Sequence, residues 1–226
     1  MAAFFHSYLY LPTLSALVFI YNTIAFHDLG LAIVFLTILV RIVLFPVFYK
    51  GAKDQALMQR IQPHIKKIQL DHKDDKEMQA KEMLNLYKKY KLNPFSGILL
   101  LILQLPVFIV LFQVFSKELS TGVFATTAFL GIINLGSKGF VLPAIAAVMQ
   151  YIQTKMMMGS QPQKGGNEEN PLASMGKTMM VVGPAFTFFI LLNLPAALSV
   201  YWTVSGVFSV FQQMYINKRL PKFEDE

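Results

Sequence analysis

Polar side chains interrupt long apolar stretches of this sequence, and they are the residues whose chemistry needs an explanation. The stretch "LTILVRIVLF" (36–45) carries Arg41, with Thr37 four residues earlier, so both lie on one face of a helix. Gln104 interrupts a second apolar stretch. A guanidinium surrounded by hydroxyls and amides could attract an acidic or polar peptide through hydrogen bonds, without covalent chemistry.

Two further stretches carry polar groups at helical spacing. Gln150, Gln153 and Thr154 share a face in one, and Tyr201, Trp202 and Ser205 lie close together in the other. Most of these groups fall in the half of each stretch that borders the basic loops. The candidate residues of a polar binding groove are therefore Arg41, Thr37, Gln104, Gln150, Gln153, Tyr201, Trp202 and Ser205.

The same inventory excludes several kinds of chemistry. The chain has no cysteine, and its four histidines form no metal-binding spacing. No Asp or Glu lies inside the long apolar stretches, which argues against a proton pump or an ion-coupled transporter. We predict no catalytic residue, no metal and no cofactor, and we do not expect an enzyme.

Composition indicates where these residues lie. Hydrophobic residues make up 54% of the 226 residues, charged residues 15%, and the mean hydropathy is +0.48. Soluble domains carry about 25% charged residues. The sequence therefore predicts an all-α, polytopic membrane protein with a single membrane domain over 27–220 and a short tail, 221–226. Five apolar stretches are long enough to be membrane-spanning helices, at about 29–48, 95–115, 139–157, 178–193 and 195–215.

The fourth stretch is the shortest, and we expect it to thin the bilayer locally. Residues 1–26 are apolar but interrupted by His6, Pro12 and Asn22, which favours an N-terminal helix lying at the external membrane interface. A sixth membrane-spanning helix is the alternative for this segment.

Charge predicts the topology. Eleven of the 20 Lys and Arg residues fall in 50–91, and five more fall in the loop 158–177 and the tail. The positive-inside rule then places these segments in the cytoplasm, the N-terminus outside and the C-terminus inside. Apolar residues at helical spacing in 50–91, separated by the polar "DHKDDKE" (71–77), predict a cytoplasmic hairpin of two amphipathic helices. Its basic surface could contact anionic lipids, and a solvated helical pair without a ligand is the alternative.

Arg41 lies about 12 Å inside the predicted first span, at about 1.5 Å per residue. One interpretation is that its side chain extends alone to the headgroups. The other is a hydrated groove, open to the cytoplasm and closed outside, in which Arg41 is the one fixed charge.

Three motifs, "DLGLAIVFLTILVRIVLFP", "NPFSGILLLILQLPVF" and "LPAALSVYW", resemble the YidC/Oxa/Alb membrane protein insertases in order and spacing over about residues 27 to 220. The match is closest to short bacterial forms without a large external domain. The resemblance implies a five-helix core and a groove for client proteins. It also implies groove roles for Arg41, Thr37, Gln104, Gln153 and the pair Tyr201-Trp202, and a need for the hairpin at about 50–91.

We therefore expect a membrane protein insertase or chaperone in the bacterial inner membrane, which receives nascent membrane proteins and releases them into the bilayer. The Sec translocon, the ribosome and signal-recognition targeting components are further candidate partners, and no specific nucleic-acid sequence is expected to bind. A small-solute transporter or channel, or a membrane scaffold without transport activity, is the alternative.

Overall fold

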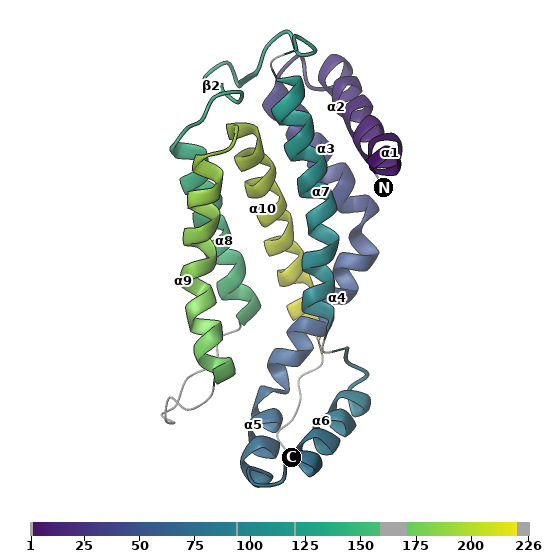
Figure 1. Cartoon of the computed structure of the whole chain (residues 1–226), viewed down its shortest axis with the longest axis vertical. Helices are drawn as coiled ribbons and strands as arrows, with labels where there is room; N and C mark the ends of the chain where they lie inside the picture. The colour runs from purple at the N-terminus through teal and green to yellow at the C-terminus, as the bar shows by residue number, and fades with distance from the viewer. Residues whose placement is uncertain (1, 94, 120, 159–170, 221–226) are drawn as a thin grey trace.

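The computed structural model describes residues 2–93, 95–119, 121–158 and 171–220, and these are mostly helical (Figure 1). The predicted loop 158–177 falls partly, and the tail 221–226 wholly, outside the described residues. The elements, in chain order, are α1 (Ala2–Phe5), the π-helix η1 (His6–Tyr10), α2 (Leu11–Thr23), α3 (Leu29–Val43), α4 (Phe45–Arg60), α5 (Gln62–Asp71), α6 (Lys76–Lys89), α7 (Ser96–Glu118), β1 (Ala128–Phe129), β2 (Ile133–Asn134), α8 (Val141–Met158), α9 (Pro171–Leu192) and α10 (Ala196–Arg219).

The first apolar stretch is not the single continuous helix predicted over 29–48. It is broken at Leu44, and the axes of α3 and α4 differ by 71°. Pro46 lies in the first turn of α4, where its missing N–H is harmless, but it could not continue the preceding helix. The bend places Arg41, in the last turn of α3, directly beside the break.

The fourth helix also differs from its prediction. α9 begins at Pro171 instead of 178 and is 22 residues long, about 33 Å at 1.5 Å per residue. The helix is therefore longer than the predicted range, but its apolar part, Met180–Leu192, is short, so local thinning of the bilayer stays a prediction. The prediction missed the first two turns because "PLASMGK" (171–177) is less apolar than the rest.

Within the described part of the chain, no helix by itself combines the length and hydropathy that a membrane crossing needs, whereas the bent pair α3–α4 does so jointly.

One end of the bundle is closed by α2 and a short antiparallel pair, β1 and β2, which the sequence analysis did not predict. Asp28 connects these elements: one carboxylate oxygen accepts from the amide of Leu31 and caps α3, and the other accepts from the amide of Leu130. Gly30 is required here, because a Cβ atom would lie 2.0 Å from Cδ2 of Phe129. The strand pair therefore packs directly onto the start of α3.

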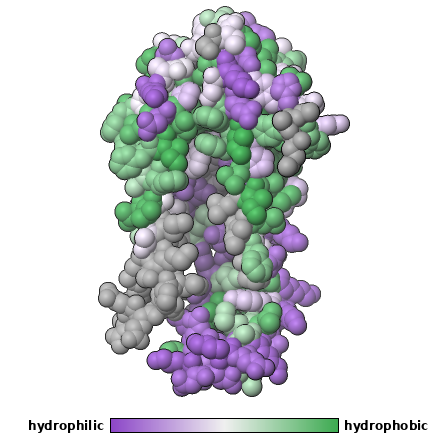
Figure 2. Space-filling model, in the orientation of Figure 1, coloured by the Kyte–Doolittle hydropathy of each residue, from purple (hydrophilic) through white to green (hydrophobic). Residues whose placement is uncertain are grey.

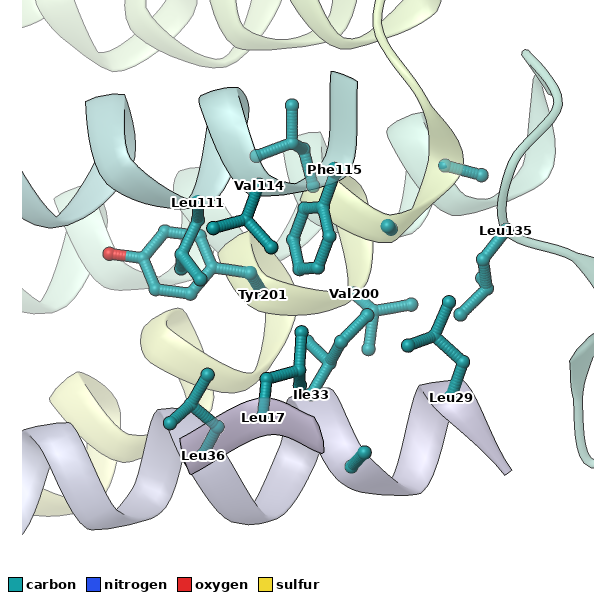
Figure 3. Close-up of a cluster of buried hydrophobic side chains, with 14 of the residues drawn as sticks. Leu17, Leu29, Ile33, Leu36, Leu111, Val114, Phe115, Leu135, Val200 and Tyr201 are labelled. Atoms are coloured by element: carbon teal, nitrogen blue, oxygen red, sulfur yellow. The ribbon is translucent and has the colours of Figure 1, made fainter. Parts of the chain in front are cut away.

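Helix α10 is the central element of the bundle and contacts α3, α4, α7, α8 and α9. At the strand-bearing end it packs on α3 and α7 through a cluster of buried side chains that includes Leu29, Ile33, Leu111, Phe115 and Val200 (Figure 3). We call this set the strand-end core. It excludes water from that end of the bundle.

A second, smaller cluster holds the opposite end, where Ala56 and Leu57 of α4 and the following Ile61 pack with Ile216 and Leu220. Helices α5 and α6 lie beside each other here, and Gln79 Nε2 of α6 donates to the backbone carbonyl of Gln69 of α5 at 3.1 Å. Hydrophilic side chains gather over this end, whereas hydrophobic residues cover much of the bundle surface (Figure 2). The range 50–91 thus contains three helices, the later part of α4, α5 and α6, where the sequence predicted two.

Candidate functional site

The candidate site is built around Arg41, which is 8% exposed. Its NH2 nitrogen lies 3.5 Å from Oε1 of Gln104 on α7, a long hydrogen bond. Its Cζ atom lies 4.6 Å from the ring centroid of Phe48, which α4 carries back to it across the bend. In the described residues, the guanidinium therefore contacts neutral groups and has no carboxylate partner.

Gln104 links Arg41 to α10. Its Nε2 donates to the hydroxyl of Tyr201, so a chain of polar contacts joins α3, α7 and α10. The ring of Tyr201 is packed in the strand-end core, and its hydroxyl points away from Leu135, along the direction in which α3 runs from Leu29 to Leu36 (Figure 3). Tyr201 thus marks the boundary between the apolar core and the polar site.

A second polar pair joins α8 to α10. Trp202 Nε1 donates to Oε1 of Gln150 at 3.0 Å, and its ring meets the edge of Phe108 with centroids 5.6 Å apart. Gln153 lies one turn further on α8, with its Oε1 3.8 Å from the position where Gly206 would carry a Cβ atom. Both half-buried glutamines therefore face α10.

The remaining candidates are placed differently from one another. Thr37 is buried, but its hydroxyl donates to the carbonyl of Ile33 at 2.6 Å, so its own helix satisfies it. Ser205 is buried one turn beyond Tyr201 on α10. Beyond it, the Nε2 atom of Gln212 and the Oε1 atom of Gln55 are buried without a hydrogen-bond partner in the described structure. Buried orphan amides of this kind usually bind water.

Sequence reasoning missed two features of this site. Phe48 was taken as the end of a straight helix, although Pro46 signalled that the chain turns before it. The second is a buried polar pair between α4 and α7, where Ser96 Oγ donates to Oδ2 of Asp54 at 2.6 Å. Asp54 is 8% exposed and lies against the first turn of α7, where the helix dipole favours a negative charge. Only the contact between α4 and α7 reveals this pair.

This arrangement defines a class: a helical protein with a buried arginine held by neutral groups between its helices. The family model described as 60Kd inner membrane protein matches residues 19–223. The chain therefore belongs to this family of inner membrane proteins, and the resemblance to YidC/Oxa/Alb proteins is confirmed.

Alignments with individual relatives support the same family assignment. The chain is 34% identical over 214 residues to the membrane protein insertase YidC of Geotalea daltonii, and 35% identical over 216 residues to that of Syntrophus aciditrophicus. The match to the protein of Nitratidesulfovibrio vulgaris is 32% over 216 residues. These alignments cover 93%, 94% and 92% of this chain but 37%, 37% and 38% of the relatives, so the chain spans somewhat more than a third of their length.

Proposed function

We propose that this chain acts as a membrane protein insertase, which receives client segments between its helices and releases them into the bilayer. The names of its relatives support this function, and the contacts of Arg41 carry it. A guanidinium has five N–H donors, and here the described residues offer it one long hydrogen bond and one aromatic face. Donors that are buried but poorly satisfied favour a polar ligand over a structural role.

The proposed mechanism starts from a closed state. Arg41 is too buried to form the wall of an open, water-filled groove in this structure. We propose that α7 moves away from α3 and α10, so that the contact between Gln104 and Arg41 breaks and a client's polar segment takes its place. Tyr201, Ser205 and Gln212 would then offer hydrogen bonds along α10 towards α5 and α6.

The apolar part of the client would leave sideways into lipid, driven by burial of about 25 cal/mol per Å² of apolar surface. The strand-end core would keep the opposite end closed during this step. No covalent bond changes, so the proposed function needs no cofactor. Five membrane crossings, with the N-terminus outside and with α5 and α6 in the cytoplasm, form part of the proposal. Contacts with the Sec translocon, the ribosome and targeting components belong to it as well.

The proposal is tested in cells depleted of their own insertase and supplied with this chain. Insertion of a short two-span client is followed by protease accessibility for the wild type, Arg41→Ala and Arg41→Lys. Lys138→Ala, which removes an exposed positive charge at the strand-bearing end, is the matched control. We expect the wild type and the control to support insertion, Arg41→Ala to lose it, and Arg41→Lys to retain part of it.

Two outcomes would contradict the proposal. If the wild-type chain is folded in the membrane but does not restore insertion of the client, a scaffold without transport activity is favoured. If the chain instead makes vesicles permeable to small solutes, and Arg41→Ala changes that permeability alone, the transporter or channel is favoured.

A further inference from the structure

A strip of aromatic rings runs along the junction of α4 and α10. Phe45 packs against Phe208 with ring centroids 6.5 Å apart and against Tyr49 at 5.6 Å. Tyr49 in turn meets Tyr215, with centroids 6.3 Å apart. These four rings are half-buried or exposed, so the strip is open on one side.

Basic side chains lie at the end of the aromatic strip that is nearer to α5. The Arg219 Cζ atom lies 4.3 Å from the ring centroid of Tyr215, and Lys53 follows Tyr49 by one helical turn. Both basic residues are exposed. We call Phe45, Phe208, Tyr49, Tyr215, Lys53 and Arg219 together the aromatic–basic strip.

The two helices run in the same direction here, so the two cations lie at the same end. Phe45 pairs with Phe208, and Tyr49 pairs with Tyr215. Further on, Arg60 donates to the carbonyl of Leu220 at 3.2 Å. Successive contacts therefore run towards the C-terminal ends of both helices. Lys53 and Arg219 both lie beyond the tyrosines, towards α5.

The charge of this surface is one-sided. In the described residues of α4 and α10 the one carboxylate is Asp54, which is buried against Ser96 and therefore turned towards α7. Lys50 and Lys218 are also exposed beside the strip. The surface thus offers positive charge at one end and apolar rings at the other, which is complementary to an amphiphile with an anionic head.

We propose that the aromatic–basic strip is a binding site for an anionic phospholipid. Arg219, Lys53 and the tyrosine hydroxyls hold the phosphate, while Phe45 and Phe208 contact the start of an acyl chain. Tyrosine and basic residues are favoured at the level of lipid headgroups, where a ring is half in hydrocarbon and its polar tip is in water. This inference rests on the membrane location in the proposed function, but not on insertase activity.

A fluorescent reporter at the strip tests the site. Trp202 is the single tryptophan of the chain, so a Trp202→Phe, Phe45→Trp variant has its only indole in the strip and keeps the groups that hold the phosphate. The variant is reconstituted in phosphatidylcholine vesicles that contain increasing fractions of brominated phosphatidylglycerol or brominated phosphatidylcholine. We expect half-maximal quenching at a roughly tenfold lower fraction of phosphatidylglycerol, because each basic residue near the surface attracts anionic lipid.

Charge variants in the same background show whether the strip itself is responsible. Lys53→Gln with Arg219→Gln should reduce the preference to about one, since the site would then lack both cations. Lys81→Gln with Lys88→Gln removes two exposed charges from α6 and is the matched control, which should keep the preference. Addition of inorganic phosphate should leave the preference unchanged.

Equal quenching by the two lipids would overturn the proposal. An equal loss of preference in the control pair would do the same, because it would assign the effect to the general surface potential. Displacement by inorganic phosphate would identify a site for free phosphate instead of a lipid. Since the readout needs no client protein, loss of insertion with a retained lipid preference would count against the proposed function alone.

Discussion

Two buried charged side chains lie thirteen residues apart on the bent pair α3–α4, and their surroundings differ. Asp54 accepts a 2.6 Å hydrogen bond from Ser96 and lies against the first turn of α7. Arg41 has an aromatic face and one hydrogen bond of 3.5 Å. The carboxylate is well stabilised where it is, and the guanidinium is not. This difference motivates the proposal that Asp54 stabilises the fold, whereas Arg41 binds a ligand.

The largest expected effect separates activity from stability at Arg41. Arg41→Ala should lower client insertion roughly tenfold to a hundredfold, the value of a hydrogen bond to a charged group. It should leave the thermal unfolding temperature in detergent unchanged or raise it, because a poorly paired buried charge is removed. Insertion per folded molecule and unfolding are measured on the same preparation. A large fall in unfolding temperature would mean that Arg41 is structural, like Asp54.

The opposite result is expected at Asp54. Asp54→Ala should destabilise the chain by about 1–3 kcal/mol, because Ser96 loses its acceptor and the start of α7 loses a negative charge. Insertion per folded molecule should stay near the wild-type value. Asp71→Ala, at an exposed acid, is the control and should change neither quantity.

A double-mutant cycle sharpens this prediction. The effects of Asp54→Ala and Ser96→Ala on unfolding should not add, with a coupling of about 0.5–3 kcal/mol. Additive effects would show that the hydrogen bond between the two residues contributes little.

A smaller effect is expected at the aromatic face that holds Arg41. Phe48→Leu keeps the residue apolar but removes the cation–π contact, which is worth about 0.5–2 kcal/mol. If this contact helps to keep the site closed, Arg41 should react faster with a guanidine-specific reagent in Phe48→Leu than in the wild type. Phe211→Leu, at an exposed ring of α10, is the control. Equal reaction rates in both variants would show that Phe48 does not restrain Arg41.

The smallest effect concerns the helical pair α5–α6. Burial raises the pKa of Tyr87 above its ordinary value of 10.0, since the phenolate loses hydration. Between pH 10 and the raised pKa, the unfolded chain ionises this group while the folded chain does not. The packing of α6 should therefore weaken as the pH rises above 10, and Tyr87→Phe should remove that part of the loss. Phenolate absorbance and helix content, followed together in an alkaline titration, measure it.

Much of the helical fold followed from local sequence. Each predicted apolar range contains a helix, and the polar turn before Lys76 is present because Asp75 caps α6 through the amide of Met78. Two predicted helix boundaries are wrong, for local reasons that hydropathy alone does not detect. Pro46 ends α3, and the less apolar first turns of α9 hide its start at Pro171.

The candidate site was predictable as a set of polar residues but not as a set of contacts. Arg41, Gln104 and Tyr201 are candidates by sequence, and the structure joins all three. Thr37 is a candidate by the same reasoning, but its hydroxyl is satisfied within α3. Phe48 could not be predicted as a contact of Arg41, because its side chain reaches Arg41 only across the 71° bend.

The sequence by itself determined the helices, the uneven distribution of charge and the family, because hydropathy, capping and motif spacing are properties of neighbouring residues. The tertiary structure alone decided which buried polar groups are satisfied. Ser96 and Asp54 are 42 residues apart, and Arg41 and Gln104 are 63 apart. Whether such groups meet depends on how α3 and α4 lie against α7, and a buried polar group is stabilised only when its partner is brought within hydrogen-bond distance.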